Sequence, residues 1–514
     1  MNRQRTPGIR RRVALVALVA MVQLLAGVWE PAALAVAQET LPARSRYEID
    51  ATLDPTLGAI NATLALDWQN TTGMPQDALY FRLYPNAGYY GDGALTVLEV
   101  AADGVPVTPV IAADPTVLEV PLPATVPAGG NIAVRVVFQT VVPTEAPDSL
   151  GILQRDARDI WSLADWYPIV AGYEPSEGWY LDAPTIFGDP TFSETADYVV
   201  RLAVPAGYTV LGSGTARPAT GPDGTVQVHI DAPLSREFAM TVLPGEMGNE
   251  LVARTAEAGS TAISLVLPRE VVVPGLADLL LDTATAAFPV YEGWLGEYPG
   301  ETLDLTIADL GGASGVSWAG TVWMDLWPFV ADGTLSEIER IRLRFLVVHE
   351  VGHQWIGNVI GANTNDHQFL GEGLTNALTV AVFREIDGPD TAERYLRADV
   401  AGAYVALLKD GRDGIADVPV SNDLNGVLHS IMVYGKAALG FEAIRQEIGD
   451  EAFFAALARY GETFRFDIAT PADLQAAFER TSGRDLDALW TFWFAAADAT
   501  VDDAEAVLDG YAAS

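Results

Sequence analysis

The spacing of apolar residues changes once along this chain of 514 residues, near residue 250, and this change constrains the fold most strongly. Between about residues 45 and 245, apolar and polar residues alternate with period two, and clusters of Pro and Gly separate the alternating runs. Such a pattern is typical of antiparallel strands. The clearest runs cover residues 47–54, 62–68, 132–138 and 198–204.

Helical spacing dominates after residue 250, although residues 303–307 still form a strand-like run. Ser336 and Glu339 have the spacing of a capping box and precede apolar residues three and four positions apart. We predict helices over residues 337–356, 372–387 and 430–448, and further helices within 451–497. The expected fold class is α+β, with an N-terminal antiparallel β-saddle or sandwich domain over residues 38–245, a mainly helical domain over 246–500, and a frayed acidic tail over 501–514.

The first 37 residues have the order of a secretory signal peptide. Five arginines within residues 3–12 precede an apolar run over residues 13–28, and a small-residue site follows at Ala35 and Ala37. We predict cleavage after Ala37 or Ala35 and export to the periplasm, cell surface or medium. The alternative is an uncleaved anchor helix that tethers the protein to the membrane, but this run is short for a span of about 20 residues. We expect no transmembrane segment in the mature chain.

Charge and cysteine content exclude several classes of protein. The chain has 30 Lys and Arg against 68 Asp and Glu, which gives a net charge of −38. A surface this acidic repels phosphate backbones, so we expect no nucleic-acid partner. There is no cysteine, which excludes disulfide scaffolds, thiol nucleophiles and Cys-based zinc sites. A metal must therefore bind to His, Asp or Glu, and the chain has only five histidines.

A candidate metal site lies inside the first predicted helix, in the sequence His349-Glu350-Val351-Gly352-His353. Residues four apart lie on one helical face, so both imidazoles can reach one metal ion. Glu350 can then take a proton from a water and return it to a leaving amine. Glu372, 19 residues after His353, completes the three protein ligands of a catalytic zinc site. The alternatives are two buried structural histidines and an ordinary carboxylate at a helix N-terminus.

These residues resemble the aminopeptidase-N-like zinc metallopeptidases, a gluzincin family. That family carries H-E-x-x-H, then eighteen residues, then Glu, and residues 353–358 also resemble its H-Q-W-x-G-N. Tyr434 lies in a segment similar to the family's Y-x-K-G. The resemblance covers nearly the whole chain after residue 37, without the C-terminal helical-repeat domain of larger relatives. It implies a thermolysin-like catalytic domain, one Zn²⁺ per chain on His349, His353 and Glu372, Glu350 as general base and acid, and Tyr434 as hydrogen-bond donor to the oxyanion.

One segment departs from the family pattern. Aminopeptidases of the family carry G-x-M-E-N before the zinc helix, and its Glu binds the α-ammonium group of the substrate. The matching segment here contains the candidate substrate-binding residues Gly311, Gly312, Ala313 and Ser314, with Ser314 in the position of the Glu. A hydroxyl cannot neutralise an ammonium group as a carboxylate does. Aminopeptidase specificity is therefore open, and Asp309 or an acid from the β domain is the alternative anchor.

The sequence thus predicts an exported zinc metallopeptidase that acts on peptides or proteins. Two alternatives remain: a non-catalytic binding scaffold with the same fold, and a hydrolase for a non-peptide substrate. We expect structural or solvent-facing roles for His229, His367 and His429, of which the last two could line the cleft. Asn376, one helical turn after Glu372, is a candidate to support the metal site from behind its ligands.

Overall fold

The computed structural model describes residues 43–144, 151–186, 191–330, 332–420 and 426–513. The predicted signal peptide, residues 1–37, lies outside this described part. All the structure below belongs to one compact unit that begins at Ala43.

The first half of the unit is built of strands, as predicted, and the predicted runs agree with β1, β2, β8 and β14 to within a few residues. The strands are β1 (Arg46–Asp54), β2 (Ala59–Gln69), β3 (Gln76–Arg82), β4 (Ala94–Ala102), β5 (Val105–Pro106), β6 (Val110–Ile111), β7 (Val117–Val126), β8 (Asn131–Val141), β9 (Leu153–Arg155), β10 (Trp161–Leu163), β11 (Ile169–Val170), β12 (Tyr173–Glu174), β13 (Gly178–Trp179), β14 (Ala196–Val204), β15 (Tyr208–Gly212), β16 (Thr215–Thr220), β17 (Val226–Ser235) and β18 (Met240–Pro244).

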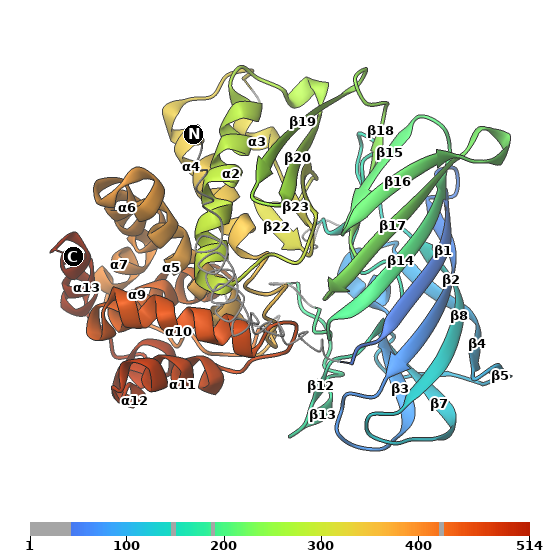
Figure 1. Cartoon of the computed structure of the whole chain (residues 1–514), viewed down its shortest axis with the longest axis horizontal. Helices are drawn as coiled ribbons and strands as arrows, with labels where there is room; N and C mark the ends of the chain where they lie inside the picture. The colour runs from blue at the N-terminus through green and yellow to red at the C-terminus, as the bar shows by residue number, and fades with distance from the viewer. Residues whose placement is uncertain (1–42, 145–150, 187–190, 331, 421–425, 514) are drawn as a thin grey trace, which may run out of the picture. The chain divides into compact units, whose positions relative to one another are not determined.

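These strands form one large twisted sheet and smaller sheets packed against it. The large sheet has the order β16-β17-β14-β1-β2-β8-β4-β5, which Figure 1 shows side by side, and two four-stranded sheets have the orders β15-β18-β10-β9 and β11-β3-β7-β6. Alternate side chains of β2 and β8 are buried, as their period-two pattern requires. One pairing differs from the antiparallel expectation: β1 and β14 run parallel, because the chain returns to β1 through a long crossover instead of a hairpin.

The second half contains one five-stranded sheet and most of the helices. The strands are β19 (Leu251–Ala258), β20 (Thr261–Pro268), β21 (Thr302–Ile307), β22 (Gly315–Trp318) and β23 (Thr321–Met324), in the order β19-β20-β21-β23-β22. The helices that matter below are α2 (Leu276–Leu295), α4 (Glu337–Gly352), α5 (Gln368–Asp387), α8 (Gly426–Ser430), α9 (Ala437–Ile448) and α13 (Val501–Ala513). The others are α3 (Trp327–Val330), α6 (Pro389–Tyr395), α7 (Gly402–Lys409), α10 (Asp450–Thr463), α11 (Pro471–Ser482) and α12 (Asp487–Trp490).

Three helix predictions needed adjustment. The Ser336–Glu339 capping box is present, but α4 ends at Gly352 instead of residue 356. The next helix begins at Gln368, four residues before the predicted start, because Gln368 and Phe369 are buried and extend its packed face. The helix predicted over residues 430–448 is interrupted by a π-helical turn, η6 (Ile431–Lys436), between α8 and α9.

The prediction of a frayed C-terminal tail was wrong, because residues 501–513 form α13. Thr500 caps this helix by accepting a hydrogen bond from the Asp503 amide, while the Asp503 carboxylate accepts from the Thr500 amide. Its apolar residues lie at helical spacing and are buried: Ala504, Val507, Leu508 and Tyr511. Of the acidic residues that suggested a tail, Asp502 is exposed, and Asp503 and Glu505 are half-buried.

One helical run among the described residues has the length and apolar composition of a membrane span, so the expectation of no transmembrane segment in the mature chain stays a prediction. Residues Gly426–Ile448 form a helical run of 23 residues that is long and apolar enough to cross a bilayer, although 72% of its most apolar window is buried inside the structure. This burial matches a core helix of the helical domain, where Leu439, Phe441 and Ile444 have no exposed surface.

Candidate active site

The three predicted metal ligands meet at one point between α4 and α5. The Nε2 atoms of His349 and His353 lie 3.0 Å apart, and each lies 3.2 Å from Oε2 of Glu372. His349 projects from the last turn of α4, His353 is the C-cap residue that follows this helix, and Glu372 projects from the second turn of α5. Helical spacing therefore places the two imidazoles on one face, and the antiparallel helix supplies the carboxylate.

This arrangement fits a zinc ion. His353 Nδ1 lies 3.0 Å from the carbonyl oxygen of Ile356 and must donate to it, so its Nε2 presents a lone pair to the shared point when the ring is neutral. Three electron-pair donors that face one another repel unless a cation lies between them. Tetrahedral ligands about 2.0–2.2 Å from an ion are roughly 3.3–3.6 Å apart, close to the separations observed. Two nitrogens and one oxygen are also the donor set of many catalytic zinc sites.

Burial and contact with the two histidines shift the pKa values of Glu372 and Glu350. Burial on its own raises the pKa of Glu372, but contact with the two imidazoles outweighs that effect and holds the pKa well below its usual range. Glu350 is 3% exposed, and burial raises its pKa while His349 and His353 oppose the rise. A buried carboxylate of raised pKa is a stronger proton acceptor than a solvated one.

Tyr434 lies beside the ligands, in the π-helical turn η6. Its ring centroid is 6.2 Å from that of His349, and its hydroxyl hydrogen-bonds the Glu372 carboxylate. Burial and the neighbouring carboxylates raise the pKa of Tyr434 well above its usual range, so the phenol stays a neutral donor. Asn376 donates from Nδ2 to the Tyr434 carbonyl oxygen at 3.0 Å. The predicted supporting residue thus contacts the tyrosine backbone, which joins α5 to η6.

The segment with the candidate substrate-binding residues leads into β22, the edge strand of its sheet. Gly311, Gly312 and Ser314 are exposed, and Ala313 is half-buried. Gly315 lies directly over the general-base candidate, since a Cβ atom on it would be 2.5 Å from Glu350 Oε1. Residues 311–318 contain no acid in any register, and Asp309 is engaged as acceptor for the Gly311 amide at 3.2 Å.

The remaining histidines have polar partners. His229 pairs with Asp231 on the surface of the β domain, and His367 Nδ1 lies 2.7 Å from Asp417 Oδ1. His429 is buried, with Nε2 2.6 Å from Gln368 Oε1. None of the three is placed among the metal ligands.

Two residues of the β half that the sequence did not single out contact the segment between the ligands. Glu174 of β12 accepts a hydrogen bond from Asn363 Nδ2 at 2.9 Å. Arg236 is buried and donates to the carbonyl oxygens of Gly357 and Asn358. Asn358 in turn donates to the carbonyl oxygen of His353 at 2.8 Å. No local pattern marks these residues, because their partners lie more than a hundred positions away in the sequence.

Comparison with known proteins agrees with this geometry. Residues 280–493 match the Peptidase family M1 domain, and this range contains the three ligand residues, Glu350 and Tyr434. Over this range the chain resembles the aminopeptidase-N-like M1 peptidases. It is 26% identical over 239 residues to aminopeptidase N of Lactococcus lactis subsp. lactis, which covers 45% of this chain and 28% of that protein. It is 23% identical over 310 residues to aminopeptidase M1-B of Oryza sativa subsp. japonica, covering 59% of this chain and 34% of that protein.

The chain thus spans about a third of the length of these M1 relatives. Solved structures match far more of it. The M1 zinc metallopeptidase from Deinococcus radiodurans superposes with a TM-score of 0.60 at 18% identity, covering 87% of this chain and 92% of that one. A two-domain M1 zinc metallopeptidase bound to L-arginine gives a TM-score of 0.61 at 17% identity, covering 91% and 93%. At these identities the match establishes a shared fold, and it extends over both halves of the chain.

Proposed function

We propose that this protein is a zinc-dependent metallopeptidase that hydrolyses peptide bonds. The observation that carries the proposal is the convergence of His349, His353 and Glu372 on one point, with the Glu350 carboxylate buried on the same helical turn. When bound, a zinc ion supplies Lewis-acid activation of water and of the scissile carbonyl group. All the other roles fall to side chains and backbone groups of the chain itself.

Glu350 accepts the proton of the attacking water and later donates a proton to the leaving amine. The Tyr434 hydroxyl donates a hydrogen bond to the oxygen on which negative charge develops, a contact worth a few kcal/mol in comparable sites. The free edge of β22 pairs with the backbone of the substrate and holds it over Glu350. Backbone pairing requires no particular side chain, so it accommodates many sequences.

The proposal is tested with two substitutions and one measurement of bound metal. Glu350→Gln should retain zinc and lose several orders of magnitude in kcat, because an amide cannot transfer the proton. His353→Ala should lose the metal, since a catalytic zinc site needs three protein ligands. Metal analysis and turnover of a peptide mixture, read by mass spectrometry, separate a peptidase from a scaffold or a hydrolase for other substrates. Undiminished zinc in His353→Ala, or peptide turnover unchanged in Glu350→Gln, would contradict the proposal.

Specificity for a free N-terminus is a separate part of the proposal. Since residues 311–318 carry no carboxylate, we expect N-acetylated peptides to be cleaved within about tenfold of free ones, equivalent to ~1.4 kcal/mol. The competing outcome is a preference of about a thousandfold for free amines, or ~4 kcal/mol. Glu174, the β-domain acid that reaches the segment between the ligands, would then be the anchor. Comparing kcat/KM for matched peptides in the natural chain and in Glu174→Gln decides between them.

Export is proposed from the sequence of residues 1–37, which lie outside the described structure. The mature chain should begin near Gln38 or Val36, and N-terminal sequencing of material recovered outside the cytoplasm checks this. Exported protein that still begins with Met1 would favour the retained anchor.

A further inference from the structure

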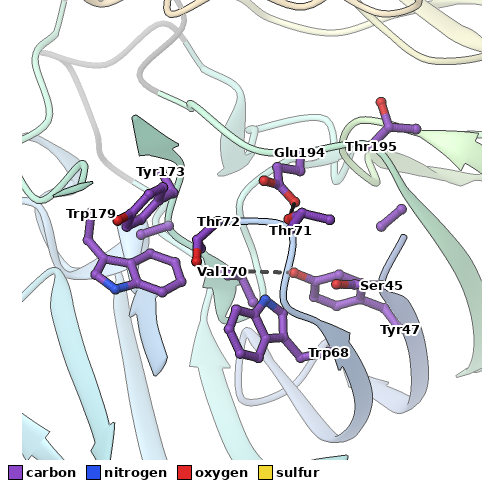
Figure 2. Close-up of a pocket in the computed structure, with 12 residues that line it drawn as sticks. Ser45, Tyr47, Trp68, Thr71, Thr72, Val170, Tyr173, Trp179, Glu194 and Thr195 are labelled. Atoms are coloured by element: carbon purple, nitrogen blue, oxygen red, sulfur yellow. Dashed lines mark hydrogen bonds between the residues drawn. The ribbon is translucent and has the colours of Figure 1, made fainter. Parts of the chain in front are cut away.

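A pocket in the β half of the molecule shares no residue with the candidate active site. Figure 2 shows its walls, with Tyr47 and Trp68 from β1 and β2, Tyr173 and Trp179 from the hairpin β12–β13, and Glu194 from the segment before β14. Its enclosed free volume is about 20 Å³. That is space for one group of about the size of a water molecule.

The walls of this pocket are mostly aromatic. The ring centroids of Trp68 and Trp179 are 6.0 Å apart, and those of Tyr173 and Trp179 are 5.3 Å apart with planes at 81°. Tyr47 is held in place because its hydroxyl accepts a hydrogen bond from the Val170 amide at 3.2 Å, the contact drawn in Figure 2. Faces of such rings carry partial negative charge and attract a cation.

Glu194 adds a formal negative charge to the same pocket. Its Oε2 accepts a hydrogen bond from the Thr71 hydroxyl at 2.5 Å, and within the described residues no Lys or Arg nitrogen forms an ion pair with it. The positive charge that acts on Glu194 is that of Arg236. Its guanidinium donates hydrogen bonds to the carbonyl oxygens of Ser193, Gly357, Asn358 and Asp467 instead. Burial raises the pKa of Glu194, which means that its charge is incompletely compensated.

Thr195 also lines the pocket, but Figure 2 shows its hydroxyl directed away from the Glu194 carboxylate. This hydroxyl is buried and has no hydrogen-bond partner among the residues that the structure describes. Buried polar groups in native proteins are nearly always paired, so the Glu194 carboxylate, which has only the Thr71 hydroxyl as a hydrogen-bond donor among the described residues, points to a missing polar group. That group must donate hydrogen bonds, because the carboxylate can only accept them.

We propose that this pocket binds a primary ammonium group, such as a lysine side chain or a free N-terminus. An ammonium group has the size of a water molecule, donates up to three hydrogen bonds and carries the positive charge that Glu194 and the aromatic rings favour. A trimethylammonium group exceeds the free volume, and a neutral alkyl group leaves the negative charge of Glu194 uncompensated. The net charge of −38 raises the local concentration of such cations around the protein.

Binding is tested on the full chain with three probes that differ at one group. Nα-acetyl-lysine amide carries a side-chain ammonium, glycinamide carries an α-ammonium, and Nα-acetyl-norleucine amide has the alkyl chain without the charge. Trp68 and Trp179 line the pocket and are two of the 12 tryptophans, so a change in tryptophan fluorescence is assigned to the pocket by its loss in Glu194→Gln. We expect a saturable change with one or both ammonium probes and none with the norleucine probe. The stronger of the two ammonium probes identifies the source of the group.

Two carboxyl-to-amide variants make the test specific. Glu194→Gln keeps an acceptor for the Thr71 hydroxyl but removes the charge, and should weaken probe binding at least tenfold. Glu177→Gln changes an exposed acid in the turn of the hairpin β12–β13 and should bind as the natural chain does. Both variants should keep their peptidase activity, so this result is independent of the proposed function. Absence of saturable binding, or equal binding by Glu194→Gln and the natural chain, would overturn the proposal.

Discussion

Asp304 tests how the burial of a carboxyl group changes the stability of this protein with pH. It lies on β21, the middle strand of the five-stranded sheet, and is 8% exposed. Its side chain hydrogen-bonds Ser264, and burial raises its pKa from 3.8 to about 7. Asp304 is not among the three residues that converge as candidate metal ligands.

The sign of the pH dependence follows from proton uptake. Between pH 4 and pH 7 the folded state holds a proton on Asp304 that the unfolded state has lost, so stability falls as pH rises. The stability that the proton on Asp304 contributes is fully present below pH 3.8 and is lost as the pH rises to about 7. Above that pH the free energy of unfolding no longer changes through Asp304. The interval between the two pKa values corresponds to ~4 kcal/mol at about 1.36 kcal/mol per pH unit.

The substitution Asp304→Asn should remove this pH dependence, because an amide has the shape of the protonated acid and never ionises. Relative to the natural chain, the variant should gain up to ~4 kcal/mol in free energy of unfolding between pH 4 and pH 8. Urea titrations at several pH values measure the difference. Glu257→Gln, an exposed acid on β19 of the same sheet, is the matched control and should show no comparable gain. If the difference in free energy of unfolding between Asp304→Asn and the natural chain does not change with pH, the reasoning is refuted.

Three further predictions concern the site. Tyr434→Phe should retain zinc and lose ~10²–10³ in kcat with little change in KM, as expected for one lost oxyanion donor; a normal kcat would assign the residue to the core. Arg236→Met should lower the free energy of unfolding by ~4 kcal/mol or more, because buried carbonyl oxygens near His353 lose their hydrogen-bond donor. It should also weaken zinc binding, which chelator competition measures. Arg217→Met, at the surface, is the control. Gly315→Ala should impair turnover with zinc retained, since the new Cβ would meet Glu350 at 2.5 Å; exposed Ser314→Ala should leave turnover nearly unchanged.

The ligands were predictable from sequence because their geometry is mostly local. The spacing of His349 and His353 fixes their relation through a single helical turn, and the loop before α5 leaves room for an antiparallel return that brings in Glu372. Strand alternation predicted β1, β2, β8 and β14 for the same reason, since period two is a property of the backbone itself.

The features that the sequence did not predict depend mostly on contacts between residues that are distant in the sequence. The tail prediction relied on acidic composition and overlooked the helical spacing of the four buried apolar residues of α13. The π-turn η6 is not signalled by propensity; its end is pinned by Lys436, whose ammonium donates to Asp413 and to the carbonyl oxygens of Gly414 and Ala496. Glu174 and Arg236 reach the site only through the folding of the β half against it. No pattern in a single sequence indicates such contacts between distant residues.

The arrangement around β22 connects the missing carboxylate with the expected substrate range. Any side chain at position 315 would collide with Glu350, so the backbone itself forms this wall of the proposed site. Among the described residues β22 pairs with one strand, β23, and we propose that its other edge pairs with an extended peptide. Pairing of this kind fixes the direction of the bound chain but lets it slide in steps of two residues. A charge that captures the end of the chain would stop the sliding, and residues 311–318 supply none, while the Asp309 carboxylate before them accepts a hydrogen bond from the Gly311 amide. The cleavage position therefore depends on a contact outside this strand, and that is why the acetylated peptide and Glu174→Gln must be measured together.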